Sequence, residues 1–143
     1  NNLMEAASWI GYTFLYIRML RRPQLYGISA DHDPELDPTL LKRRLELAYA
    51  AITVLERHDL VKFDRKSGML QSTDLGRIAS YFYISNESIA TYTDLMRPTM
   101  NEVDLLRVFS LSSEFKFLRV REEEKLELTK LLARVPIPIK ESV

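Results

Sequence analysis

The chain has 143 residues, with 20 basic and 20 acidic side chains and therefore no formal net charge. This length fits one domain or two small ones and excludes a complete large enzyme. Hydrophobic residues make up 46% and charged residues 28%, which predicts a folded chain with a buried core. The balanced charge disfavours an autonomous nucleic-acid binder, and the lack of cysteine excludes disulfides and thiolate chemistry. The longest apolar stretch, residues 9–20, is too short to span a bilayer, so no membrane is expected.

Apolar spacing predicts the first two helices. One helix is expected over residues 5–22, apolar on nearly all sides and ended by Pro23. A short extended piece at 25–28 and an acidic loop at 31–37 should follow. Asp37 and Pro38 have the residue types of a helix start, so a second helix should run from Pro38 to about His58. Its predicted apolar face is Leu41, Leu45, Ala48, Ile52 and Leu55.

A β-hairpin comes next, with strands at 60–64 and 69–73 and Gly68 at a positive φ in the turn. Four helices are then expected, starting near residues 74, 87, 99 and 121. Thr73 or Asp74 should cap the first, and Thr99 with Glu102 should form a capping box on the third. The last two helices should bury Val103, Leu106, Phe109, Leu128, Leu131, Leu132 and Val135. The fold class is therefore mainly α with a β-hairpin wing.

No constellation of catalytic or metal-binding residues is apparent. The four glycines are scattered, so no loop cradles phosphate, and the two histidines lie on different elements. The acidic loop from Asp31 lacks the glycine and glutamate of an EF-hand, which leaves a solvated loop as the interpretation. Three glutamates at 122–124 match the dipole of a helix start rather than a catalytic carboxylate pair.

The wing carries a modest positive charge. Residues 61–80 have four basic against two acidic side chains, whereas residues 31–60 have four basic against seven acidic. The helix before the wing is therefore not a basic recognition surface, and packing against protein is favoured. Tyr81, Tyr83 and Tyr92 are predicted to pack in the core or between helices rather than to stack on bases.

Several segments together resemble a known family. Residues 9–20, 25–28 and 73–84 resemble the region that follows the two RecA domains in Ski2-like DExH-box RNA helicases. Residues 107–115, 120–128 and 134–142 are most similar to the spliceosomal branch rather than the activating-signal-cointegrator branch. The resemblance implies a winged-helix domain over 1–84, whose first helix is expected before Asn1, and the start of a Sec63-type helical bundle over 85–143.

The resemblance also implies a function. The chain would be a non-catalytic segment of an ATP-dependent helicase that unwinds the U4/U6 small nuclear RNA duplex in the nucleus during spliceosome activation. It would couple motion of the RecA domains to the bundle that grips RNA. ATP and magnesium would bind elsewhere in the parent helicase, with no cofactor or metal in this segment. The partners would be the RecA domains and the remaining bundle, the small nuclear RNA duplex and other spliceosomal proteins.

Two sets of residues are candidates for this role. Trp9, Tyr12, Phe14 and Tyr16 are the expected packing hub, and Arg65, Lys66 and Arg77 are the cations expected to face RNA. Two other hypotheses remain open. The chain could be an autonomous winged-helix regulator that binds nucleic acid, or a protein-docking segment of an inactive helicase cassette.

Overall fold

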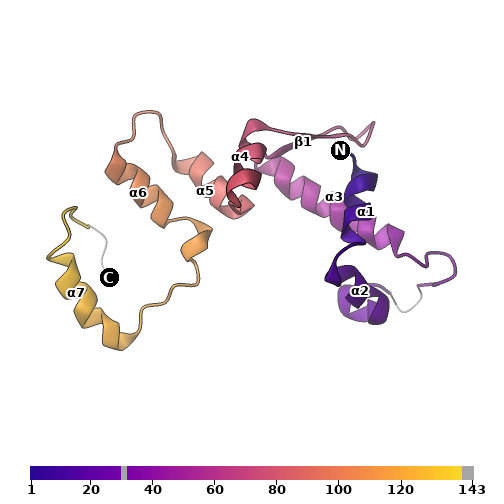
Figure 1. Ribbon diagram of the computed structural model, residues 1–143, viewed down its shortest axis with the longest axis horizontal. Helices are drawn as coiled ribbons and strands as arrows, with labels where there is room; N and C mark the ends of the chain where they lie inside the picture. The colour runs from indigo at the N-terminus through magenta and orange to yellow at the C-terminus, as the bar shows by residue number, and fades with distance from the viewer. Residues whose placement is uncertain (30–31, 140–143) are drawn as a thin grey trace. The chain divides into compact units, whose positions relative to one another are not determined.

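The computed structural model describes residues 1–29 and 32–139 (Figure 1). The chain divides into two compact units, Asn1–Asn86 (unit 1) and Glu87–Val143 (unit 2), and each is treated by itself. Within the described residues no helix is both long and apolar enough to cross a membrane. The acidic loop expected from Asp31 falls partly outside the described residues.

The single helix expected at the start of the chain is wrong. Two helices form instead, α1 (Leu3–Ile10) and α2 (Phe14–Arg21). Between them Thr13 donates its hydroxyl to the carbonyl of Ile10 at 2.7 Å and accepts from the amide of Tyr16 at 3.4 Å. A threonine side chain that bonds nearby backbone in this way ends one helix and caps the next. Apolar spacing alone could not reveal this break, because the segment is apolar on nearly every side.

The segment after α2 is a turn of 3-10 helix, η1 (Pro23–Tyr26), and not the extended piece expected at 25–28. Gly27 ends it with φ 73°, in the left-handed region that glycine adopts without strain. A Cβ at Gly27 would lie 3.0 Å from the guanidinium of Arg43, so the turn passes close to the next helix.

That helix, α3 (Leu41–Arg57), begins three residues later than the predicted start at Pro38 and ends where expected. Asp37 acts as its cap, because its carboxylate accepts from the amide of Leu41 at 2.7 Å and from that of Lys42 at 3.1 Å. The delay arises because residues 38–39 form a turn and residue 40 has φ 52°, which is not helical. Capping by Asp37 is thus confirmed, with the helix starting beyond the proline.

The β-hairpin is confirmed. Strands β1 (Val61–Phe63) and β2 (Leu70–Ser72) pair antiparallel, and Gly68 in the turn has φ 72°. The start of the chain lies along the outer edge of β2, where the amide of Leu70 donates to the carbonyl of Asn1 at 2.9 Å. The amide of Leu3 donates to the carbonyl of Gly68 at the same distance. These bonds connect the beginning of α1 directly to the wing.

Helix α4 (Asp74–Phe82) starts against the end of the wing. Thr73 caps it, as predicted, accepting from the amide of Gly76 at 2.9 Å. The same hydroxyl lies 2.6 Å from the carbonyl of Asp59 and 3.0 Å from that of Leu60. A Cβ at Gly76 would lie 2.0 Å from the Leu60 carbonyl oxygen, so this contact requires glycine.

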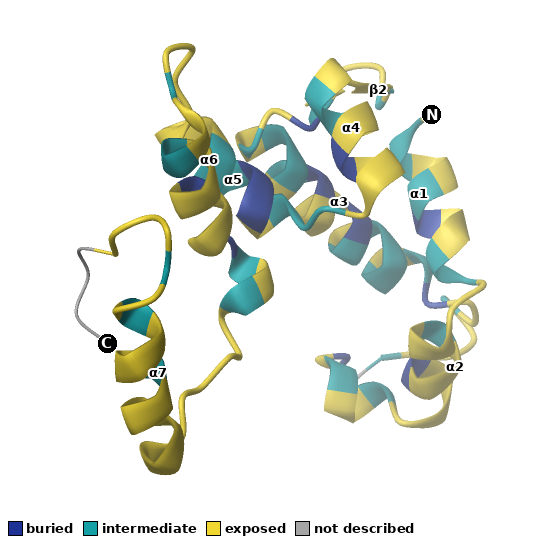
Figure 2. Ribbon diagram, turned by 60° about the vertical axis from the view of Figure 1, so that its left-hand side comes forward, coloured by how far each residue is buried: buried dark blue, intermediate teal, exposed yellow. Residues whose placement is uncertain are grey.

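The core of unit 1 lies along α3, and α1 packs against α3 (Figure 2). Met19, Ile28 and Leu40 form one buried cluster. Ala48 and Ile52 are buried as predicted for the apolar face of α3. The other buried apolar residues of unit 1 are Ala7, Leu60, Phe63 and Ala79.

Unit 2 is helical as far as the structure describes it. Its elements are α5 (Asn86–Leu95), α6 (Glu102–Ser110), η2 (Ser113–Phe115), η3 (Glu122–Glu124) and α7 (Lys125–Leu132). Asn101 and Asp104 form the capping box of α6, in place of the predicted Thr99 and Glu102. Helix α6 therefore begins at Glu102 and not at the predicted Thr99.

Burial in unit 2 is much less than the sequence predicts. Leu106, Phe109 and Leu131 are exposed, at 58%, 53% and 55%, and α7 has no buried residue (Figure 2). Their contacts within the unit are partial: the ring of Phe109 makes an edge contact with Phe115 in η2, with centres 5.2 Å apart, and Leu106 lines an open cavity shared with residues 135–139. The fold class expected from the sequence, mainly α with a small β-hairpin, is nevertheless confirmed.

Candidate docking surface and nucleic-acid interface

Three of the four residues predicted as a packing hub lie together at the break between α1 and α2. Trp9 is 73% exposed, and Tyr12 and Phe14 are each 86% exposed. The rings of Trp9 and Tyr12 are 6.1 Å apart and tilted by 60°. We call Trp9, Tyr12 and Phe14 the aromatic corner. Large apolar side chains left in solvent at one place are typical of a surface that contacts a partner.

Tyr16, the fourth predicted hub residue, has a different environment. It is half-buried and packs against the cluster of Met19, Ile28 and Leu40. The guanidinium carbon of Arg44 lies 5.1 Å from the centre of its ring, within the range of a cation–π contact. Tyr16 therefore belongs to the core of unit 1, while the aromatic corner faces outward.

Arg44 is a structural residue that the sequence analysis missed. Its Nη1 donates to the carbonyl of Ala7 at 3.3 Å, and its Nε donates to the carbonyl of Thr39 at 3.1 Å. These two bonds and the contact with Tyr16 connect α1, α2 and the start of α3. The sequence gives little indication of this role, because the carbonyl that Arg44 bonds, at Ala7, is 37 residues away along the chain.

Arg65, in the wing, is not free to approach a phosphate without losing a partner. Its guanidinium forms a forked ion pair with Glu56, with Nη2–Oε2 at 2.7 Å and Nη1–Oε1 at 3.4 Å. It also lies 5.7 Å from the ring centre of Phe63. The hydrogen bond from Arg65 holds the pKa of Glu56 below its ordinary value, and the same bond raises the pKa of Arg65. The wing arginine thus connects the hairpin to α3.

The other two cations expected to face RNA differ from each other. Arg77 pairs with Asp74 and donates to the carbonyl of Ser72 at 3.3 Å. Lys66 bonds Asp64 only through its backbone amide, at 3.0 Å, and its ammonium has no ion pair among the described residues. Surface ion pairs are weak, so Arg65 and Arg77 could leave their carboxylates for a phosphate. Of the three cations, only Lys66 has a charge that no described acidic side chain compensates.

The tyrosine prediction is wrong at the end of α4. Tyr81 is 78% exposed and Tyr83 is 94% exposed, so neither lies in the core of unit 1. Phe82, between them, is 65% exposed, and its ring centre lies 4.9 Å from that of Tyr81. Tyr92, in unit 2, is half-buried, which agrees with a packing role.

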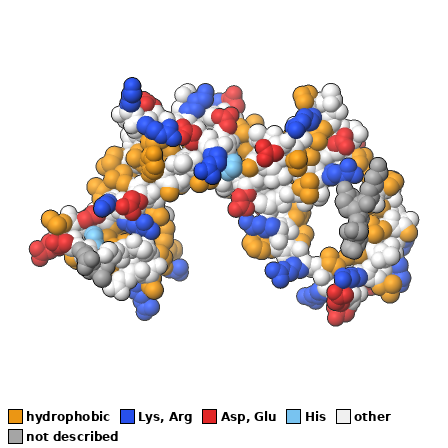
Figure 3. Space-filling view, turned by 180° about the vertical axis from the view of Figure 1, so that it is seen from behind, with side chains coloured by type: hydrophobic (Ala, Val, Ile, Leu, Met, Phe, Trp, Pro, Cys, Tyr) orange, Lys and Arg blue, Asp and Glu red, His pale blue; other side chains and the backbone are white. Residues whose placement is uncertain are grey.

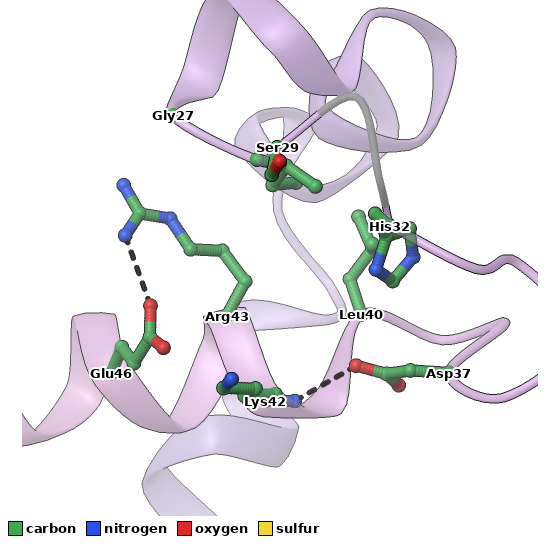
Figure 4. A pocket seen from close by; sticks show the side chains of 9 residues that line it. Gly27, Ser29, His32, Asp37, Leu40, Lys42, Arg43 and Glu46 are labelled. Carbon is green, nitrogen blue, oxygen red and sulfur yellow. Dashed lines mark hydrogen bonds and ion pairs between the residues drawn. The ribbon is translucent and has the colours of Figure 1, made fainter.

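A cavity of about 360 Å³ lies beside the start of α3 (Figure 4). Arg43 and Glu46, one turn apart on α3, line it and pair with each other at 3.1 Å. His32 lies at one side, while Asp37 is occupied with the first amides of α3. Over the described part of the chain no three histidine or acidic side chains come together as metal ligands. Gly11 and Gly27 follow α1 and η1, Gly68 lies in the hairpin turn and Gly76 in α4, and the expectation that this segment holds no cofactor stays a prediction.

These features define a class of protein: a winged-helix module joined to a helical segment, with large apolar side chains exposed on its surface. Comparison with known proteins agrees with this class. A family described as the Winged Helix-turn-helix domain matches residues 1–57, and one described as the Sec63 Brl domain matches residues 72–143. The division between residues 84 and 85 expected from the sequence is not tested by these matches and stays a prediction.

Individual relatives match nearly the whole chain. It is 58% identical over 142 residues, 99% of its length, to a human protein named "U5 small nuclear ribonucleoprotein 200 kDa helicase". It is 56% identical, over the same 99%, to the Arabidopsis thaliana protein named "DExH-box ATP-dependent RNA helicase DExH12". A Dictyostelium discoideum protein named "Activating signal cointegrator 1 complex subunit 3-like" is 58% identical over 97% of the chain.

The chain belongs to the Ski2-like DExH-box helicase family, of which it carries winged-helix and Sec63 Brl sequence. It spans only about 7% of the length of the human relative and 6% of the other two. Percentage identity does not by itself separate the spliceosomal relative from the one named for the cointegrator complex.

Proposed function

We propose that this chain is a non-catalytic segment of a nuclear, ATP-dependent spliceosomal RNA helicase that unwinds the U4/U6 small nuclear RNA duplex. In this proposal its local task is to transmit motion of the RecA domains to the helical bundle that grips RNA. ATP and magnesium are held by the RecA domains of the parent helicase. Its partners are the RecA domains, the rest of the bundle, the small nuclear RNA duplex and other spliceosomal proteins.

The observation that carries the proposal is the aromatic corner. Trp9, Tyr12 and Phe14 are 73–86% exposed although all three are large aromatic side chains. Burying such side chains against a partner contributes about 1.5–3 kcal/mol each. Aromatic residues of this kind are also the usual centres of binding energy in protein interfaces. A neutral chain with an exposed aromatic surface is suited to packing between domains.

Unit 1 also has connections that could transmit a displacement. Arg44 connects α1 to α3, and Arg65 connects the wing to α3 through Glu56. Backbone bonds from the amides of Leu70 and Leu3 to the carbonyls of Asn1 and Gly68 join the chain start to the wing. A push on the aromatic corner would therefore move α1, α3 and the wing together rather than deform one helix.

The test compares two variants of the full-length helicase. Tyr12→Ala with Phe14→Ala removes two rings of the aromatic corner, and Phe117→Ala removes one ring that is 82% exposed in unit 2. We expect the first variant to hydrolyse ATP at the wild-type rate but to unwind RNA duplex about tenfold more slowly. The Phe117 variant serves as the matched control. Wild-type unwinding by the first variant would refute the coupling role.

The docking-segment hypothesis has support of its own. Leu106, Phe109 and Leu131 in unit 2 are more than half exposed, although Phe109 contacts Phe115 and Leu106 lines a cavity with residues 135–139. A segment that only docks other proteins would lose partners from a tagged full-length helicase in a Leu106→Asp variant, while the unwinding rate stayed unchanged. The same tagged protein also tests membership of the complex, because U5 small nuclear RNA should copurify with it.

The autonomous-regulator hypothesis is the least favoured. Arg65 and Arg77 are already paired with acidic side chains, which leaves a weak positive field at the wing. We expect the chain alone to bind duplex DNA no more tightly than an unrelated neutral protein at two salt concentrations. Tight binding with a steep salt dependence would favour the regulator instead.

A further inference from the structure

The outward face of α2 combines apolar and basic side chains. Tyr16 and Met19 point toward the core, since Met19 is fully buried and Tyr16 packs against its cluster. At 100° per residue the opposite side of the helix carries Phe14, Arg18 and Arg21. All three are exposed. The aromatic corner therefore continues onto a face of α2 that holds two arginines.

The charge of this region is uncompensated. Residues 6–29 contain Arg18, Arg21 and Arg22 and no aspartate or glutamate, although the whole chain is neutral. All three arginines are exposed, and none has an ion pair within the described ranges 1–29 and 32–139. Elsewhere in unit 1 Arg65 and Arg77 do have acidic partners.

Partly exposed aliphatic side chains flank the rings and arginines on α2 and continue into η1. Leu15, Ile17 and Leu20 are 41–44% exposed, and Leu25, in η1, is 71% exposed. Hydrophobic side chains and Lys or Arg side chains also lie next to one another on the surface of unit 1 seen in Figure 3. An apolar centre with arginine at its edge has the composition of a protein interface, where aromatic residues and arginine are enriched.

We propose that α2 and the aromatic corner form one docking surface, and that this surface receives an apolar patch rimmed by carboxylates on another domain of the same helicase polypeptide. The proposal rests on the proposed function for the existence of that domain and adds the chemistry of its surface. Arg18, Arg21 and Arg22 pair with the carboxylates, and the aromatic corner fills the apolar patch. Guanidinium groups bind carboxylates through two parallel hydrogen bonds, which fixes the orientation of the two domains as well as their affinity.

A protein occupant explains this surface better than RNA does. RNA would also be attracted by three arginines, but it would leave Leu15, Ile17, Leu20 and Leu25 without a complementary apolar surface. Single-stranded nucleic acid is bound by aromatic rings and cations, and aliphatic side chains have no stacking face.

The first part of the test asks whether the aromatic corner is covered. Hydroxyl-radical footprinting would compare oxidation of Trp9, Tyr12 and Phe14 in the full-length helicase with that in the 143-residue chain. The exposures of 73–86% in this chain lead us to expect at least about a fivefold decrease in the full-length protein. Equal oxidation in both would overturn the docking surface and the proposed coupling function together.

The second part asks what the arginines contact. Arg18→Lys with Arg21→Lys keeps both charges and supplies amines that a carbodiimide joins directly to carboxylates. We expect cross-links, mapped by mass spectrometry, from positions 18 and 21 to acidic residues of the helicase outside unit 1. Arg119→Lys is the control, because Arg119 is exposed in unit 2 and has no ion pair among the described residues.

The third part reverses the charge. Arg18→Glu with Arg21→Glu should raise oxidation of the aromatic corner about two- to fivefold in the full-length helicase, because like charges across an interface repel. Arg119→Glu should leave it unchanged. A covered corner with no cross-links above the control and no effect of reversal would refute the carboxylate rim while leaving the coupling function intact. If the aromatic corner is protected from oxidation only after a 12-nucleotide oligouridine is added, the occupant is RNA and the proposal is overturned. If its protection in the isolated chain increases with protein concentration, the occupant is a second copy of the chain and the proposal is likewise overturned.

Discussion

The contact between Gly76 and Leu60 gives the sharpest test of how unit 1 is assembled. Gly76 lies in the first turn of α4, where its missing side chain lets the helix approach the end of the α3–β1 connection. A Cβ there would lie 2.0 Å from the carbonyl oxygen of Leu60 and 3.0 Å from its carbonyl carbon. Both are backbone atoms, so no side-chain rotation can relieve the overlap. Gly76→Ala must move α4 away from the wing by more than 1 Å, since an ordinary contact needs about 3.4 Å.

The cost can be worked out from what that movement breaks. The amide of Thr73 bonds the Leu60 carbonyl at 3.2 Å, and the Thr73 hydroxyl lies 3.0 Å from the same oxygen. Losing these bonds costs about 0.5–1.5 kcal/mol each, and overpacking adds about 1–3 kcal/mol. Alanine returns about 1 kcal/mol through its higher helix propensity. The net expectation is a loss of about 1–5 kcal/mol in the free energy of unfolding.

Thermal and urea unfolding followed by circular dichroism would measure this loss. For a unit of 86 residues it corresponds to a decrease in Tm of about 5–25 °C. Gly68→Ala is the control, because a Cβ there meets nothing within 4 Å and only the positive φ is strained, at about 1 kcal/mol. If Gly76→Ala were as stable as the wild type or more so, helix propensity would outweigh the contact and the close approach of α4 to the wing would be refuted.

Three further predictions concern the cap of α3, the contacts of Arg44 and the Arg65–Glu56 ion pair. Asp37→Ala removes the acceptor for the first amides of α3 and should lower the free energy of unfolding by about 1 kcal/mol in urea titrations, with Asp37→Asn losing less. Arg44→Met removes two hydrogen bonds to backbone carbonyls and the contact with Tyr16, so it should cost about 1–3 kcal/mol by the same measurement, and an unchanged midpoint would contradict the bracing role. In an NMR titration the pKa of Glu56 should lie below its ordinary value and rise in Arg65→Met. Because folding lowers the pKa of Glu56, the stabilisation from the Arg65–Glu56 pair is present above the pKa of Glu56 in the unfolded chain and is lost as pH falls through its pKa in the folded protein. A Glu56 pKa that Arg65→Met leaves unchanged would contradict the assignment.

Local chemistry made several features predictable from the sequence. Asp37, Thr73 and Gly68 each act within a few residues of their own position, as helix caps or at a positive φ, and the structure confirms all three. The positions of the two hairpin strands, predicted at 60–64 and 69–73, agree with β1 and β2 to within one residue at each end. Where prediction failed locally, at Thr13 and at Asn101, a competing polar side chain bonded the backbone instead.

The sequence by itself determined the mainly helical fold class, the β-hairpin, several helix ends and the family to which the chain belongs. Only the tertiary structure decided which apolar residues are covered: Met19 is buried, whereas Trp9 and Leu131, equally apolar in the sequence, lie in solvent. It also decided that Arg44 braces α1 and that Arg65 is held by Glu56. The physical reason is that hydrophobic burial has no direction and a long-range hydrogen bond leaves no local pattern, so both depend on what the folded chain brings within contact.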